Sequence, residues 1–381
     1  MSYESVDKLQ KVLQENVFHY AKYSKKAAGR ALGTIVEIIT YYLLKTWELN
    51  DSISIERGMG EYGNPDIKHN VEYSLHPVVA TYAVKFPKDG RSITSHRVLK
   101  VLVENDIDLS SFITRSTTNL LSKDQILRNA CTLAISEKSY LLCSFDKDDG
   151  EEFVLRIYEQ LHKAFAMLEC KRVGVEEGTK KGPQTIEKAK QGAYVARTVS
   201  SLQKIRNEKG QMLGIIYRSD GTIVSAPFTE LVEEVINSND AELLRRFVLT
   251  VGVVSNHGNW FTSENQNKEL RVLAQSYDWL LFLTDNGLAH FIEKLLLNPE
   301  LEHTLIQEAF NASYSGDKKK NQFTKVQMSV KADKMLLEYF TKNLAEIESW
   351  FEIISPKGKA IEALKSELEL LKDKNWIEIL K

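Results

Sequence analysis

The sequence has few of the residues that would place it in several large classes of protein. Its 381 residues include only three cysteines, Cys131, Cys143 and Cys170, and no two of them form a Cys-x-x-Cys pair. This spacing argues against a zinc site and against a disulfide framework, so we expect a reduced, cytoplasmic protein. The first residues are polar and amphipathic, and we expect no signal peptide.

Long apolar runs and an excess of positive charge are also missing. We find no run of about 18 apolar residues, so no transmembrane helix is expected. The 50 basic and 52 acidic residues give a net charge of −2, which is not the balance of a strongly basic DNA-binding protein. A basic cleft remains compatible with this charge, because local charge decides binding. No Gly-rich ATPase or methyltransferase motif is present, which argues against a self-contained motor or modification enzyme.

The most informative stretch that is present runs from Ala164 to Val173. Five apolar residues, Ala164 to Leu168, precede Glu169-Cys170-Lys171 and predict a buried strand. Residues two apart on a strand point to the same face, so Glu169 and Lys171 are expected side by side at the end of a core strand. A carboxylate that binds a divalent cation, next to an ammonium group that assists water or phosphate, suits a metal-dependent hydrolase.

This Glu-x-Lys strand, followed by a loop with Gly, Lys and Pro and then a long helix, resembles the PD-(D/E)XK nucleases and, within them, the type II restriction endonucleases. The resemblance implies an α/β fold with a mixed central β-sheet and meander flanked by helices. It implies Mg²⁺ as cofactor and site-specific cleavage of double-stranded DNA, with Glu169 and Lys171 as catalytic residues. A homodimer and a cognate DNA methyltransferase are expected by the same analogy.

A third catalytic candidate is Glu37, in the middle of a helix predicted from about residue 25 to 47. The helix is apolar on most faces, and a buried carboxylate costs several kcal/mol unless it is paired or bound to a metal. Several restriction endonucleases carry an acid on their first core helix. The resemblance therefore implies that Glu37 supports the metal site.

The acid that completes the metal site has several candidates. Residues from 139 onward predict a β-meander, with a turn at Asp149-Gly150 and with the strand of residues 164–173 as its third strand. The register of this meander brings acids at 149–152 alongside Glu169. The family usually has Asp at this place; Asp149 matches by residue type and Glu152 by register.

A literal Pro65-Asp66 pair offers a second solution. Asp66 precedes Glu169 by 103 positions, which would require a large insertion between neighbouring strands. Pro-Asp is also ordinary turn chemistry. Asp66 therefore stands as an alternative metal ligand, with Glu72 on the following strand as a secondary candidate.

Basic and polar residues around the Glu-x-Lys strand are candidates for DNA contacts. A loop and a helix predicted from about 183 to 206 carry positive charge, and a polar loop follows an apolar strand at 248–254. The candidates in these segments are Lys180, Lys181, Lys190, Arg197, His257 and Asn259. A solvated surface is the plain alternative for each of them.

The rest of the chain predicts two regions. Residues 1–300 would form a nuclease core with DNA-recognition insertions, and residues 301–381 a helical C-terminal region that serves dimerisation or DNA clamping. Further expectations are a helix at 123–136, a hairpin at Asp220-Gly221, and helices at 287–297, 300–313, 329–353 and 358–379. Alternative functions are a repair or recombination exonuclease of the same fold, or a non-catalytic DNA-binding protein.

Overall fold

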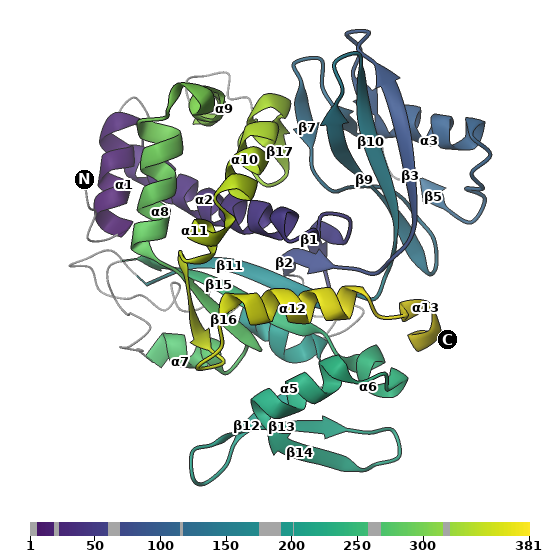
Figure 1. The fold of residues 1–381 in the computed structure, drawn as a ribbon, viewed down its shortest axis with the longest axis vertical. Coiled ribbons are helices and arrows are strands. Elements are labelled where there is room, and N and C mark those ends of the chain that lie inside the picture. The colour runs from purple at the N-terminus through teal and green to yellow at the C-terminus, as the bar shows by residue number, and fades with distance from the viewer. Residues whose placement is uncertain are drawn as a thin grey trace.

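The structure, a computed structural model, describes residues 6–18, 23–59, 69–114, 117–174, 192–200, 202–257, 268–314 and 321–381. Helices cover a central sheet, and smaller sheets extend from it (Figure 1). The mixed α/β class expected from the sequence is confirmed.

Six strands form the central sheet. Their order is β1 (Ile53–Gly58), β2 (Asn70–Leu75), β11 (Ala166–Gly174), β15 (Leu249–His257), β16 (Trp279–Leu283) and β18 (Phe351–Ser355). β11, β15 and β16 run parallel, whereas β1, β2 and β18 pair antiparallel with their neighbours. The Glu-x-Lys strand is therefore interior to a mixed sheet, as its unbroken apolar run predicts.

Helix α2 (Ser24–Thr46) packs against β11 and is itself covered by α1 (Val6–Asn16) and α10 (Val330–Lys342). Lys45 and Tyr42 of α2 both contact Asp333 of α10, at 3.0 Å and 2.6 Å. Among the described residues, Ala27–Thr46 is the one helical segment long and apolar enough to cross a membrane, and 72% of its most apolar window is buried inside the protein. This burial favours a core helix, and the segment is not an unbroken apolar run, since it contains Glu37 and Lys45.

A second sheet has the order β3 (Val78–Pro87), β10 (Glu152–Leu161), β9 (Ser139–Asp148), β8 (Cys131–Ile135) and β5 (Ile113–Thr114). The β9–β10 hairpin agrees with the prediction, but the three-strand meander is wrong. β10 pairs with β3 on its other side, while β11 pairs with β2 and β15 in the central sheet. β11 therefore pairs with strands that are distant in the sequence and not with β10, the strand that precedes it in the chain.

The helix predicted at 123–136 is also wrong, because this segment forms β7 (Ile126–Arg128) and β8. Gln125 and Ala130 have φ values of 56° and 43°, which interrupt any helix there. β7 lies in a four-stranded sheet with β17 (Gln327–Ser329), β6 (Asn119–Leu121) and β4 (Ile93–Thr94), which continues into α3 (Ser95–Glu104). Through its pairing with β17, β7 thus holds the segment that precedes β17, and this segment reaches the candidate site.

The segment after the Glu-x-Lys strand differs partly from its prediction. Residues 192–199 are helical, but residues 203–206, expected at the end of the same helix, form a strand. This strand, β12 (Gln203–Arg206), makes a three-stranded sheet with β13 (Met212–Tyr217) and β14 (Ile223–Pro227). The hairpin at Asp220-Gly221 is confirmed, with Gly221 at a φ of 85° that suits glycine. α5 (Phe228–Asn237) and α6 (Ala241–Arg246) lead to β15.

The C-terminal part is mostly helical, as expected, but it also completes the central sheet. α7 (Lys268–Ala274) lies between β15 and β16. α8 (Asp285–Phe291), a π-helix (Ile292–Leu297), a 3₁₀ turn (Leu301–His303), α9 (Thr304–Tyr314), α10, α11 (Leu344–Glu348), α12 (Ile361–Lys372) and α13 (Trp376–Ile379) follow β16. Residues 351–353, predicted as helix, belong to β18, which pairs with β16. Residues 301–381 therefore share the sheet of residues 1–300.

Candidate functional site

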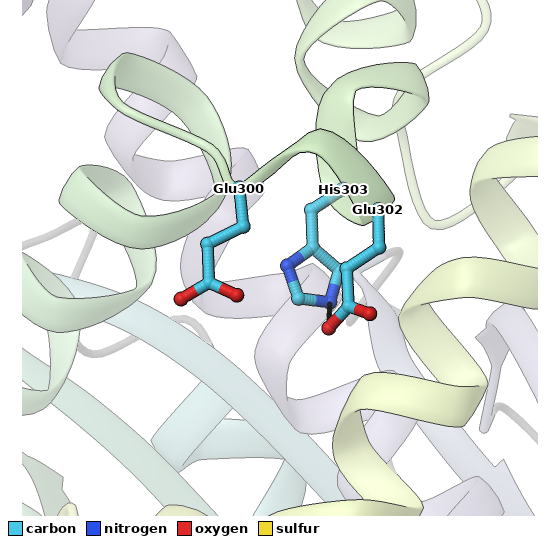
Figure 2. Close-up of side chains that lie close together, drawn as sticks. All are labelled: Glu300, Glu302 and His303. Atoms are coloured by element: carbon cyan, nitrogen blue, oxygen red, sulfur yellow. Dashed lines mark ion pairs between the residues drawn. The ribbon is translucent and has the colours of Figure 1, made fainter.

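Two groups of acids stand out, and the first lies on the surface. Glu300, Glu302 and His303 bring their ligand atoms within 4.8 Å of one another, beside the start of α9 (Figure 2). Both carboxylates are exposed, and the Nε2 of His303 lies 3.6 Å from Glu302. Exposed acids are common without any ion, so this cluster carries no assignment.

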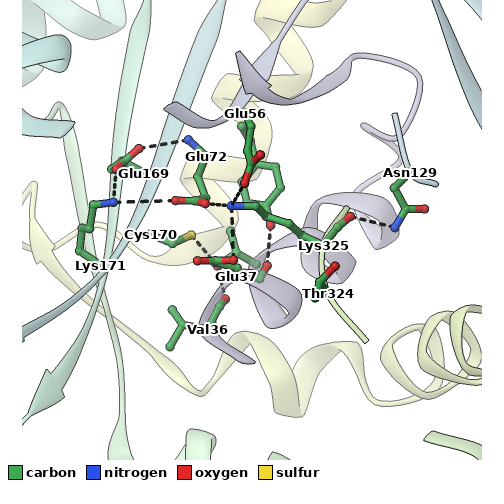
Figure 3. A network of polar contacts seen from close by, with 12 residues as sticks. Val36, Glu37, Glu56, Glu72, Asn129, Glu169, Cys170, Lys171, Thr324 and Lys325 are labelled. Carbon is green, nitrogen blue, oxygen red and sulfur yellow. Dashed lines mark hydrogen bonds and ion pairs between the residues drawn. The ribbon is translucent and has the colours of Figure 1, made fainter. Parts of the chain in front are cut away.

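The second group is a row of three glutamates across neighbouring strands of the central sheet (Figure 3). The pairs Ile55↔Tyr73 and Arg57↔Val71 bracket Glu56 and Glu72 of β1 and β2. The β2–β11 pairing ends at Leu168↔Tyr73, so that Glu169 is the next residue opposite Glu72. Like charges on facing strands repel, and this row requires cations between its members.

Lys171 supplies one of these cations. Its Nζ lies 2.6 Å from Oε1 of Glu169 and 3.9 Å from Oε2 of Glu72. The Glu169 side chain is fully buried, and Lys171 is 25% exposed. Cys170, between them, points the other way, with its Sγ 3.4 Å from the Thr40 hydroxyl of α2. The predicted placement of Glu169 and Lys171 on one face of a central strand is found.

Glu169 has two further polar partners. The Nε2 of His69 lies 2.8 Å from its Oε1, and the backbone N–H of Glu72 donates to its Oε2 at 3.1 Å. β2 and β11 separate at this point, because a carboxylate oxygen takes the N–H that a sheet hydrogen bond would use. Both oxygens of the buried carboxylate are therefore satisfied.

Lys325 supplies the second cation, from a segment between α9 and α10. Its side chain is 5% exposed, and its ammonium group contacts three carboxylates, those of Glu37, Glu56 and Glu72. The distances to Glu37 and Glu56 are both 3.3 Å. Figure 3 shows the side chain reaching into the middle of these acids.

Glu37 joins the cluster from α2, as the sequence led us to expect. Its side chain is 25% exposed and lies against Lys325. Burial raises the pKa of Glu37, and the nearby Lys325 and Lys171 ammonium groups oppose that rise. Glu37 therefore adds a carboxylate from a helix to the carboxylates that come from the strands.

Packing fixes Glu169 on its remaining side. A Cβ atom at position 192 would lie 2.3 Å from its Cγ and 2.7 Å from the Tyr277 hydroxyl. Glycine alone fits here, at the start of the helix of residues 192–199. Burial raises the pKa of the Tyr277 hydroxyl, and the Glu169 charge adds to that rise. Tyr277 thus stays a neutral phenol beside the carboxylate.

The charges of the whole cluster leave a surplus of acid. The four carboxylates of Glu37, Glu56, Glu72 and Glu169 face the ammonium groups of Lys171 and Lys325, which leaves −2 when these six groups are ionised and His69 is counted as neutral. Oxygen-only side chains with this charge are the ligands that Mg²⁺ prefers. Glu72 and Glu169, which share Lys171, are the pair best placed to hold it.

The structure does not bring Asp149 or Glu152 to this site. The end of β10 near Gln160 touches the central sheet, where Gln160 donates to Asp51 O at 2.6 Å. Glu152 begins β10 at its other end, about 26 Å away at roughly 3.3 Å per residue. There it pairs with Lys85 at 3.3 Å, and Asp149 accepts the Glu152 N–H in the turn. These two predicted ligands are wrong, because the meander that placed them does not form.

The remaining predicted residues have different positions. Arg197 lies on the exposed side of the helix of residues 192–199. His257 is the last residue of β15, where it pairs with Gly174 of β11. Asp66, Lys180, Lys181, Lys190 and Asn259 lie outside the described residues.

Sequence reasoning missed His69, Glu56 and Lys325 and ranked Glu72 too low. Glu72 had one signal, its place inside a predicted strand just after a glycine-containing loop. Glu56 has a φ of 52°, which alternation along β1 does not reveal. Lys325 has no local signal, since 154 positions separate it from Lys171 at the end of the Glu-x-Lys triplet.

A basic groove of about 400 Å³ lies between the β12–β14 sheet and the central sheet. Its lining includes Lys204, Arg206, Arg271 and Lys357, opposed by the single carboxylate of Glu230. Lys204 donates to the backbone oxygen of Tyr277. The side-chain hydroxyl of the same tyrosine lies next to Glu169. One tyrosine thus contacts both the groove wall and the acidic cluster.

Comparison with known proteins gives no family for this chain. No family model matches it, no curated protein is significantly similar to it, and no solved structure is significantly similar to it. The assignment of function therefore rests on the geometry of the cluster and on the motif that the sequence carries.

Proposed function

We propose that this protein is a Mg²⁺-dependent endonuclease that hydrolyses phosphodiester bonds of double-stranded DNA at specific sites, as type II restriction enzymes do. The observation that carries the proposal is the meeting of Glu169, Lys171 and Glu72 on adjoining strands, with Glu37 close by on the first long helix. These are the elements that the resemblance to PD-(D/E)XK nucleases implies. Glu72 takes the place that we had given to Asp149 or Glu152.

The residues present fit a divalent cation. Glu72 and Glu169 would hold Mg²⁺, which would polarise the phosphate and lower the pKa of a bound water. The surplus charge of the cluster supports this assignment, because buried acids without a compensating cation are costly. The core would then be of the restriction-endonuclease type, with β11 as its catalytic strand.

Each side chain has a role that follows from its position. Lys171, partly exposed and next to both acids, orients the attacking water or stabilises negative charge that develops on the phosphate. His69 holds Glu169 through its Nε2, and Gly192 leaves room for that carboxylate. Glu37 contributes further negative charge to the cluster from the Lys325 side of Glu72.

The basic groove gives the DNA backbone a surface to contact. The exposed cations Arg206, Arg271 and Lys357, against one carboxylate, attract phosphates in a salt-dependent manner. We also propose a homodimer, because cleavage of both strands of a palindrome is simplest with twofold symmetry. Sedimentation of the protein at several concentrations measures the oligomeric state directly.

The test is digestion of a covalently closed plasmid with Mg²⁺ and with EDTA. We expect Mg²⁺-dependent linear or fragmented product, with Glu169→Gln and Lys171→Met losing at least a hundredfold in rate. Wild-type cleavage rates in either variant would refute the assignment. An exonuclease would leave the closed circle intact and degrade only linear DNA. A DNA-binding protein without catalysis would retard DNA without metal and give no product with any divalent ion.

A further inference from the structure

The contacts of Lys325 suggest a role that goes beyond a structural ion pair. The Lys325 side chain is 5% exposed, so its ammonium group has lost most of its water, and anionic partners must offset that loss. Lys325 has three such partners, Glu37, Glu56 and Glu72. Three carboxylates from three elements around one point make a coordination site for a cation, and here the cation is covalently part of the chain.

The backbone of Lys325 is held firmly in place. Its carbonyl oxygen accepts from Asn129 Nδ2 at 2.9 Å, and the carbonyl oxygen of Val326 accepts from the Asn129 N–H at 2.9 Å. The pairing of β17 with β7 continues this attachment. Lys325 therefore enters the cluster from a fixed strand end, and its position is built into the fold.

The two oxygens of Glu72 face different cations. Oε1 contacts Lys325, and Oε2 lies on the side of Lys171 and Glu169. Glu72 thus separates the cluster into two compartments. One contains Glu169 and Lys171, and the other contains Glu37, Glu56 and Lys325.

We infer that Lys325 permanently occupies the second cation position of this site, so that the protein binds one divalent ion at the cluster where two would otherwise fit. The inference rests on the proposed function, because it assumes that Glu72 and Glu169 hold the first ion. Lys325 is a positioning residue in this view: it keeps Glu72 and Glu37 neutralised without taking up a metal. Removing its charge would free three carboxylates for a second divalent ion.

The experiment measures Mn²⁺ stoichiometry by equilibrium dialysis of the full-length protein. All variants carry Glu300→Gln and Glu302→Gln, which removes the surface cluster as a competing site. We expect one Mn²⁺ per chain for this background, two after Lys325→Met, and one again after Lys325→Arg. Adding Glu37→Gln to Lys325→Met should abolish or weaken the second site at least tenfold.

Thermal unfolding with and without Mn²⁺ provides a second readout, in case Lys325→Met folds poorly. We expect Mn²⁺ to raise the melting temperature of Lys325→Met more than that of Lys325→Arg, because metal then replaces the missing ammonium group. Two ions bound to the background protein would overturn the assignment of Lys325. So would one ion bound to Lys325→Met, together with a Mn²⁺-induced rise in melting temperature no larger than that of Lys325→Arg. No Mn²⁺ bound to the background protein would instead remove the metal premise of the nuclease proposal itself.

Discussion

A Cβ atom at position 192 would lie 2.3 Å from the Cγ of Glu169, closer than two such carbon atoms can approach. The helix of residues 192–199 therefore begins against the carboxylate that we assign to the metal. The shape of this contact limits the position of Glu169 on the side that its polar partners leave open.

Gly192→Ala should displace Glu169 and lower the rate of plasmid cleavage by about a hundredfold, since small misplacements of reacting groups have effects of this size. Cleavage kinetics and thermal unfolding measure the two consequences. Gly33→Ala is the matched control, because nothing lies within 4 Å of a Cβ at that helix position. It should keep full activity and gain about 0.5–1 kcal/mol of stability. An active Gly192→Ala enzyme would contradict the assigned position of Glu169.

Glu72→Gln should abolish Mg²⁺-dependent cleavage, with a loss of at least a hundredfold, because it removes a charge between Lys171 and Lys325. Glu152→Gln is the control: this glutamate is also on a strand and also pairs with a lysine, but it lies on the second sheet. We expect the control to cleave at the wild-type rate. If Glu152→Gln loses cleavage and Glu72→Gln keeps it, Glu152 and not Glu72 belongs to the active site.

Charge reversal in the basic groove should weaken DNA binding without altering the cluster. Arg206→Glu combined with Lys357→Glu is expected to lower affinity for a DNA duplex at least tenfold at low salt and to reduce the salt dependence of binding. Fluorescence anisotropy in Ca²⁺ measures this without cleavage. Lys100→Glu on α3, whose Nζ lies 3.6 Å from Glu104, is the control. Equal affinity of all three proteins would exclude the groove as a DNA contact.

Glu367 should make the protein less stable as the pH rises. Burial raises its pKa to about 7, although the hydrogen bond from Trp279 opposes the rise. A raised carboxyl pKa means that the folded state binds the proton more tightly, so this stabilisation is complete below the unfolded pKa and is lost between about pH 4.5 and 7.

Between pH 5 and 8, wild type should therefore lose on the order of 1–3 kcal/mol more stability than Glu367→Gln, because the amide does not ionise. Urea unfolding at both pH values gives the two free energies. Glu369→Gln, an exposed change two positions further along the same helix, should leave the wild-type pH dependence in place. The idea fails if Glu367→Gln and wild type lose equal stability over this range.

The sequence predicted those features that depend on neighbouring residues. The buried helix with Glu37 and the apolar strand that ends in Glu169-x-Lys171 follow from local apolar patterns, and the structure contains both of them. The hairpin of β9 and β10 also formed, because an Asp-Gly turn favours local pairing.

The partners of β11 could not be predicted in this way. Its neighbour β2 precedes it by about ninety residues and β15 follows it by about eighty, so neither pairing leaves a local pattern. The choice of Asp149 and Glu152 followed from assuming that β10 lies next to β11. Lys325 is a stronger case, since only the attachment of β17 to β7 brings it to Glu72.

The origin of Lys325 and β18 in the last quarter of the chain has a consequence for biosynthesis. A ribosome-bound chain that ends before residue 325 has Glu37, Glu56 and Glu72 but lacks the ammonium group that neutralises them. It also lacks β18, the edge strand that closes the central sheet. A truncated product therefore carries an unbalanced acidic cluster and an open sheet, and the cluster described above can assemble only after residue 325 has been synthesised.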